Sequence, residues 1–140
     1  MAITHILADT SFLYALYDKS DKHHLRTHKI INAAQIEIVL LDVVLGETLY
    51  LLKDRIGIHA VVKCLDGLLA ARVPLEPITA VDLLRIREIT TIYADAQLDF
   101  VDCCIMALAE RLNITKVLTF DHRDFGIFRP KHCDYLKLLP

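Results

Sequence analysis

The sequence is poor in the residues that interrupt regular structure. It has only four glycines and four prolines among 140 residues, and no repeat or low-complexity stretch. Long flexible linkers are therefore not expected. The hydrophobic fraction of 54% is ample for one full core, and the length is typical of one domain. We expect a single domain over residues 1–140.

Long apolar runs are also missing. The longest contain about ten residues, well short of the roughly 20 that cross a bilayer. Residues 1–5 lack the basic start and the apolar stretch of a signal peptide. These absences predict a cytoplasmic protein with no membrane partner.

The four cysteines do not form the pairs that a zinc site requires. Cys64, Cys103, Cys104 and Cys133 include no C-x-x-C spacing. Cys103 and Cys104 are adjacent, so on a helix their thiols diverge, whereas zinc ligands must converge. We expect buried, reduced thiols that act as small apolar groups.

Basic charge is not in excess. The chain has 16 Lys and Arg against 18 Asp and Glu, a net charge of −2. This balance argues against a protein that coats nucleic acid, although an enzyme that holds one short stretch of RNA is still compatible with it. Aromatic residues are few and scattered, so the sequence indicates no base-stacking platform.

Apolar runs alternate with helical periodicity along most of the chain. Short apolar runs predict strands at residues 5–8, 36–41, 116–120 and 135–139, with extended chain at 73–78. Helical spacing predicts helices at residues 12–17, 22–34, 43–56, 58–72, 80–93 and 100–112. Asp42 and Asp99 are predicted to cap two of these helices, and Thr79 with Asp82 resembles a capping box. This order predicts an α/β fold with a mainly parallel sheet and helices on both faces.

Two acidic residues directly follow predicted strands. Asp9 comes after the first strand, and Asp121 comes after the strand at residues 116–120. Ligands in open α/β sheets bind at the carboxyl ends of the strands, so both carboxylates are expected at that edge.

Two further acids lie in apolar helices. Glu47 is surrounded by apolar residues in its predicted helix, and Gly46 beside it leaves room for another group. Asp102 lies in the first turn of a helix that is apolar over almost its whole circumference, which predicts that this helix is buried. Burying an ionised carboxylate is costly without compensation, and neither acid has Lys or Arg three or four residues away. Clustered carboxylates bind protons or a cation, and hard oxygen ligands select Mg²⁺ or Mn²⁺.

Structural roles explain three of these acids individually. Asp9 could cap the following helix, Asp102 could favour the positive end of its helix, and Asp121 could begin a turn. Glu47 has no such alternative. Four acids in this arrangement favour one shared site for metal-assisted phosphoester hydrolysis.

Several segments together resemble the PIN domain, and in particular the VapC-type toxins of bacterial toxin–antitoxin pairs. They are Asp9-Thr-Ser, Glu47, residues 93–111, residues 118–125, and the ending from Phe128 to Pro140. The resemblance covers essentially the whole chain. It implies a three-layer α/β/α fold in a single PIN-like nuclease domain, cleavage of RNA with Mg²⁺ or Mn²⁺, a homodimer, and inhibition by a small antitoxin.

The resemblance also assigns residues. The four acids of the family match Asp9, Glu47, Asp102 and Asp121, which are expected to be both catalytic residues and metal ligands. Asp99 is expected mainly to cap a helix, and Asp124 to have at most an accessory role. Thr10, Ser11 and Thr119 are expected to orient carboxylates through hydrogen bonds.

Other functions and other sites were compared with this hypothesis. An aspartyl-nucleophile phosphatase usually has a second acid two residues after the first, where this chain has Ser11, and a basic residue where it has Asp121. A PIN-like module that binds RNA or protein without cutting would be marked by loss of an acid, and none is missing.

His24 and His28 could bind metal but have no evident third ligand. The basic residues near the site could contact phosphates or could simply be solvated; they are Lys53, Arg55, His122, Arg123, Arg129, Lys131 and His132.

The mean hydropathy of +0.39 is high for a soluble monomer of this length. An apolar excess is more favourably placed in an interface than in solvent. We therefore expect a partner surface. The resemblance to VapC-type toxins implies two such surfaces, one for a homodimer and one groove for an antitoxin, with the helices at residues 22–34 and 43–56 as candidates for the groove.

Overall fold

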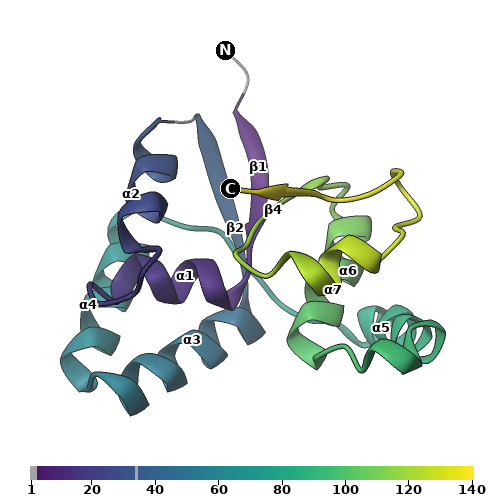
Figure 1. Ribbon diagram of the computed structural model, residues 1–140, viewed down its shortest axis with the longest axis horizontal. Helices are drawn as coiled ribbons and strands as arrows, with labels where there is room; N and C mark the ends of the chain where they lie inside the picture. Colours follow the sequence, from purple (N-terminus) through teal and green to yellow (C-terminus); the bar gives the residue numbers. More distant parts are fainter. Residues whose placement is uncertain (1–2, 34) are drawn as a thin grey trace.

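The computed structural model describes residues 3–33 and 35–140. Its centre is a five-stranded sheet in the order β3-β2-β1-β4-β5 (Figure 1). The strands are β1 (Thr4–Ala8), β2 (Ile36–Leu41), β3 (Leu75–Glu76), β4 (Lys116–Leu118) and β5 (Lys137–Leu139). Every neighbouring pair is parallel, so all five carboxyl ends meet at one edge.

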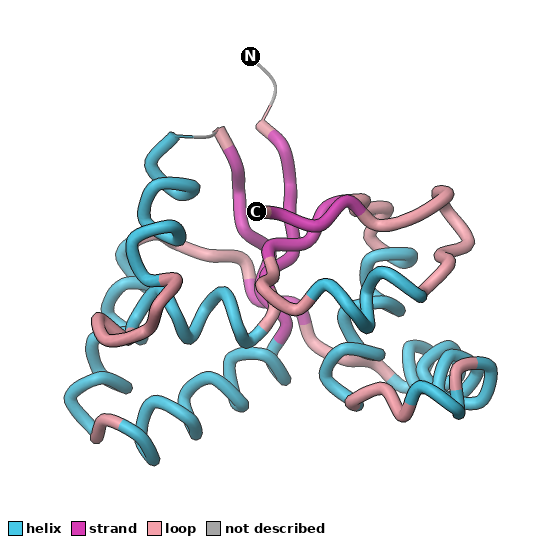
Figure 2. Tube along the Cα trace, viewed as in Figure 1, coloured by secondary structure: helices cyan, strands magenta, loops and turns pink. Residues whose placement is uncertain are grey.

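Helices cover both faces of the sheet. The helices are α1 (Thr10–Tyr17), α2 (His24–Ala33), α3 (Asp42–Arg55), α4 (Ile58–Ala70), α5 (Ala80–Ile92), α6 (Phe100–Arg111) and α7 (His122–Ile127). Helices α1 to α4 lie on one side of the strands and α5 to α7 on the other, as the cyan and magenta tubes of Figure 2 show. The predicted three-layer α/β/α architecture with a parallel sheet is confirmed.

Alternating side chains of the central strand explain the two layers. Ile6 and Ala8 pack with Phe12 of α1 and with the partly buried Ile30 and Ile31 of α2. Leu7 points into the larger core, which contains α6. Successive residues of a strand face opposite sides, so an uninterrupted apolar strand requires a helical layer on each face.

Helix α6 is the core helix that its sequence predicts, because all seven residues from Cys103 to Ala109 are buried. Its carboxyl end is joined to α5 by ion pairs of Arg85 with Glu110 and of Arg111 with Asp82. The predicted capping box is also confirmed, since Thr79 and Asp82 bond reciprocally at the start of α5. The end of α6 opposite Asp102 is therefore fixed to α5.

Some local predictions are wrong. Asp42 is the first residue of α3 and not its cap, and β4 ends at Leu118, before Asp121. Residues 94–96 form a 3₁₀ turn, and α7 was not predicted at all. Ala34, placed at the end of a predicted helix, lies outside the described residues.

Three of the four cysteines have the burial that the sequence predicts. Cys64, Cys103 and Cys104 are free and buried, whereas Cys133 is free but only half-buried. Within residues 3–33 and 35–140, no helix combines the length and the apolar character needed to cross a bilayer.

Candidate active site

The four predicted acids line one cavity at the carboxyl edge of the sheet. The cavity has a volume of about 310 Å³ and lies where β1 and β4 end and α6 begins, with α3 along its side. Six carboxylates line it: Asp9, Asp21, Glu47, Asp99, Asp102 and Asp121. The fold therefore brings together acids from distant parts of the chain.

Asp9 is buried at the cavity, with 3% of its surface exposed. Its Oδ1 accepts hydrogen bonds from Ser11 Oγ (2.7 Å) and from the Phe12 amide (3.0 Å), which caps α1. Its Oδ2 accepts from Thr119 Oγ1, next to the end of β4. Burial nevertheless outweighs these bonds and raises the pKa of the Asp9 carboxyl above its usual value. The predicted hydrogen bonds of Ser11 and Thr119 to a carboxylate are thus present, whereas Thr10 Oγ1 is buried without a partner within the part of the chain that the structure describes.

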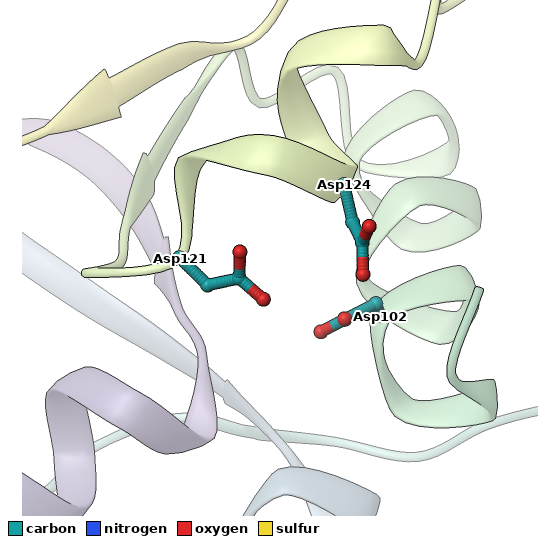
Figure 3. A group of neighbouring side chains, drawn as sticks. All are labelled: Asp102, Asp121 and Asp124. Carbon is teal, nitrogen blue, oxygen red and sulfur yellow. The ribbon is translucent and has the colours of Figure 1, made fainter. Parts of the chain in front are cut away.

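Three other acids converge across the cavity. One carboxylate oxygen from each of Asp102, Asp121 and Asp124 lies within 4.8 Å of the other two. Figure 3 shows the three side chains pointing toward one another. Asp102 comes from the first turn of α6, while Asp121 and Asp124 come from the start of α7. Asp124 Oδ1 is buried, and no described group bonds to it. Asp124 therefore lies beside Asp102 and Asp121, and its accessory role stays a prediction.

The electrostatics of this group favour a cation. The pKa of Asp102 rises to about 7, first because its carboxyl is buried and then because Asp9 and Asp121 add like charge. A carboxylate at that position is disfavoured at neutral pH unless positive charge compensates it. This group consists of three oxygen donors, with no histidine or cysteine from the part of the chain that the structure describes, and it suits a hard divalent ion such as Mg²⁺ or Mn²⁺.

A model of the PIN domain matches residues 6–128 of the sequence. The chain belongs to the PIN-domain family. It is 28% identical over 125 residues to Ribonuclease VapC26 of Mycobacterium tuberculosis, a match that covers 89% of this chain and 93% of that relative.

Solved structures resemble this PIN domain over most of their length. VapC20 of Mycobacterium tuberculosis, described as a sarcin-ricin loop cleaving toxin, superposes with a TM-score of 0.77 at 26% identity, covering 87% of this chain and 92% of that one. VapBC2 of Rickettsia felis, bound to a promoter DNA fragment, gives 0.70 at 17% identity over 97% and 98% of the two chains. A toxin–antitoxin complex of Klebsiella pneumoniae gives 0.68 at 18% identity over 88% and 92%. The last two support the fold alone.

Glu47 occupies the PIN-domain cavity in a way that its sequence did not predict. Its side chain is exposed, because the buried face of α3 is formed by Val44, Thr48 and Leu52. A Cβ added at Gly46 would meet no heavy atom within 4 Å, so Gly46 faces open space and makes no room for a second group. The argument from a costly buried charge is therefore wrong for Glu47, although the residue does line the cavity.

Asp99 also differs from expectation. It is the residue before α6, but its side chain makes no capping hydrogen bond; it is exposed and lines the cavity. Its charge is one of those that raise the pKa of Asp102. Asp99 therefore contributes to the field of the site and does not cap the helix.

The cavity has an aromatic side that sequence reasoning missed. His23 stacks on Phe120 with ring centroids 4.0 Å apart and 6° between the planes, and Phe12 stacks on Phe120 at 5.8 Å. His23 and Phe120 both line the cavity. These rings come from separate segments, so the absence of a local aromatic motif could not exclude them.

Most of the basic residues considered from the sequence lie elsewhere. His132 Nε2 lies 2.8 Å from the carbonyl oxygen of Ile114, and Arg129 donates to the carbonyls of Gly126 and Phe128. His24 Nδ1 lies 2.8 Å from the carbonyl of Ala15, and the described residues place no third acid, cysteine or histidine with His24 and His28. Arg55 is the exception, since it lines the cavity.

Proposed function

We propose that this PIN domain is a metal-dependent ribonuclease toxin that hydrolyses RNA phosphodiester bonds and is inhibited by a small antitoxin. The observation that carries the proposal is the convergence of Asp102, Asp121 and Asp124 beside the buried Asp9. Two relatives support it, one named a ribonuclease and the other described as a toxin that cleaves the sarcin-ricin loop.

The roles of the acids follow from their surroundings. Asp102, Asp121 and Asp124 would hold a divalent ion, with Asp9 and Glu47 contributing directly or through water. Such an ion, when bound, polarises a phosphate and lowers the pKa of an attacking water. Both Asp9 oxygens already accept hydrogen bonds, which leaves them fewer lone pairs for an ion. Asp9 instead acts mainly as a fixed negative charge that joins the ends of β1 and β4.

The alternative enzyme class fits these contacts less well. An aspartyl nucleophile at Asp9 would need an accessible oxygen, but this carboxylate is 3% exposed and bonded at both oxygens. Ser11 bonds to Asp9 and accepts from the Phe120 amide, so it does not replace the second acid of such phosphatases. A binding module without catalysis is disfavoured because none of the four family acids is missing.

RNA cleavage with and without metal tests the proposal. Purified chain is incubated with total bacterial RNA in Mg²⁺, in Mn²⁺ and in excess EDTA, and the products are resolved on denaturing gels. We expect cleavage only with metal, and its loss in Asp121→Asn but not in Asp134→Asn, an exposed acid outside the cavity. Full activity in EDTA would contradict metal dependence. Binding of metal and RNA without any cleavage would favour the binding module.

The proposed antitoxin surface is an apolar cavity of about 400 Å³ between β2 and the helices α1, α2 and α4. It is lined by residues of α1, α2 and α4, among them Leu16, Ile31 and Leu68. The sequence had favoured a groove between α2 and α3, but among the described residues α3 contributes none to this cavity. We propose a groove between α2 and α4, and the sequence-based pair of α2 and α3 stays a prediction that nothing has tested.

A further inference from the structure

Helix α3 presents a stripe of three residues to the acidic cavity. Glu47, Leu51 and Arg55 are spaced four residues apart and all line it, as expected for one face of a helix. Glu47 is nearest the end of β2, whereas Arg55 lies two turns further along, in the last turn of α3. Among the residues that the structure describes, Arg55 is the only lysine or arginine that lines the cavity.

The guanidinium of Arg55 is held in place without being neutralised. Its Cζ lies 5.0 Å from the centroid of the Tyr14 ring, a cation–π geometry. The Tyr14 hydroxyl donates to Asp18 Oδ2 at 2.6 Å, which fixes the ring. The ion pairs within residues 3–33 and 35–140 do not include Arg55. Arg55 is exposed, so the N–H groups that do not contact the Tyr14 hydroxyl are available to an anion from solvent.

The cavity needs such a cation if its substrate is a polyanion. A metal ion compensates charge only at the Asp102 end, whereas Asp21 and Glu47 also line the cavity and repel neighbouring phosphates. At a rise of 1.5 Å per residue, the eight residues from Glu47 to Arg55 correspond to roughly 12 Å along the helix axis. One phosphate is too small to contact both ends of this stripe. The phosphate that contacts Arg55 is therefore a different one from the phosphate at the acids, on the same RNA strand.

We propose that Arg55, supported by Tyr14, binds a phosphate of the RNA that neighbours the scissile phosphate and is not itself cleaved. This inference rests on the proposed ribonuclease function and assigns a positioning residue to it. Arginine suits the task because its planar guanidinium donates two parallel hydrogen bonds to one phosphate. The strand then runs along α3 from the acids toward the carboxyl end of the helix.

A purely structural role makes different predictions. Arg55 in the last turn of α3 also stabilises the helix dipole and packs on Tyr14. If that were its whole role, Arg55→Ala would lower the Tm and leave RNA affinity unchanged.

The kinetic test uses Arg55→Ala, Arg55→Lys and the control Lys53→Ala. Lys53 is exposed on the same turn of α3 and does not line the cavity. On an RNA that the wild type cleaves, we expect Arg55→Ala to raise KM about tenfold or more with kcat nearly unchanged. Arg55→Lys should recover part of the loss, and Lys53→Ala should match the wild type. An unchanged KM in Arg55→Ala would overturn the proposal while leaving the ribonuclease function intact.

A binding test separates the two proposals. Anisotropy of a short fluorescein-labelled single-stranded RNA is measured in Ca²⁺ across a series of salt concentrations. We expect Arg55→Ala to weaken binding and to reduce the slope of log K against log salt by about one, with no change in Lys53→Ala. If the chain cleaves no RNA but binding depends on Arg55 in this way, the phosphate site stands and the nuclease proposal fails. Equal slopes in wild type and Arg55→Ala would overturn the phosphate site.

Discussion

The carboxylates of this PIN domain combine structural and chemical roles in single residues. Asp9 caps α1 and Asp121 caps α7, as a purely structural explanation would have it, yet both line the acidic cavity. A helix cap holds a carboxylate in one rotamer, so the cap also orients the charge toward the site. Asp99 shows the converse, since it stands at a capping position and makes no cap.

The raised pKa of Asp102 predicts that removing its charge stabilises the metal-free protein. Its pKa of about 7 lies above the ordinary value of 3.8, so the metal-free folded protein binds an extra proton between those values. The stability due to this proton is complete below about pH 4 and is lost as pH rises through about 7. Asp102→Asn removes this loss, and we expect its metal-free Tm at neutral pH to exceed that of the wild type by a few degrees.

Thermal melts in EDTA from acidic to slightly alkaline pH measure this effect. The Tm difference between Asp102→Asn and wild type should grow with pH, vanish near the acidic end, and shrink when Mg²⁺ is added to the wild type. Asp134→Asn, which changes an exposed acid, is the control and should show no such trend. A large drop in the Tm of Asp102→Asn at all pH values would mean that Asp102 is structural.

Asp124 predicts a specific loss of metal binding. Its Oδ1 is buried, lacks a bonding partner among the described residues, and faces Asp102 and Asp121. Asp124→Asn keeps the shape but removes the charge, so we expect Mn²⁺ affinity to fall about tenfold or more with little change in Tm. Titration calorimetry with Mn²⁺ measures the affinity, and Asp134→Asn again serves as the control. Unchanged affinity would remove Asp124 from the proposed ligands.

The elements show which sequence signals are reliable. Uninterrupted apolar runs predicted β1, β2 and the buried α6 because burial on every side leaves no polar position. Helix α7 was missed because it has only six residues and a single buried side chain, Phe125, too few for a periodic pattern. Without that helix, the three-residue spacing of Asp121 and Asp124 could not be recognised as one face. Glu47 was misjudged for a related reason, since helical context alone does not say which face meets solvent.

Two glycines in neighbouring helices predict opposite effects of alanine. A Cβ at Gly67 of α4 would lie 2.3 Å from the Tyr17 hydroxyl oxygen of α1, whereas a Cβ at Gly46 of α3 would meet nothing within 4 Å. We expect Gly67→Ala to destabilise the protein by about 1–2 kcal/mol through overpacking. Gly46→Ala should stabilise it by about 0.5–1 kcal/mol through helix propensity.

Urea denaturation of the two glycine variants measures these free energies of unfolding. Tyr17→Phe in the Gly67→Ala background removes the clashing oxygen and should recover part of the loss. Equal stabilisation by both alanines would show that the contact between α1 and α4 is loose at Gly67.

At the scale of the whole molecule, two helices on opposite sides of the sheet expose apolar faces. Helix α4 exposes Ile58, Val62, Leu65 and Leu69, which share one face, beside the apolar cavity proposed for an antitoxin. Helix α5 exposes Val81, Leu84 and Ile92 on the opposite layer of the sheet, far from that cavity (Figure 1). Two separate apolar faces are consistent with two different partners. The mean hydropathy of the sequence could not show that there are two such faces.

We therefore predict a homodimer formed through α5, with α4 left free for the antitoxin. Leu84 is 64% exposed and Ile92 66% exposed, and burying such side chains against a second copy is favourable. Light scattering at high micromolar concentration should give a dimer for the wild type and a monomer for Leu84→Glu/Ile92→Glu. Leu69→Glu, which changes a leucine of α4 that is 76% exposed, is the control and should remain dimeric. A monomeric wild type would refute the dimer. A charge placed in a buried apolar contact destabilises that contact. Dissociation by Leu69→Glu alone would therefore place the dimer interface on α4.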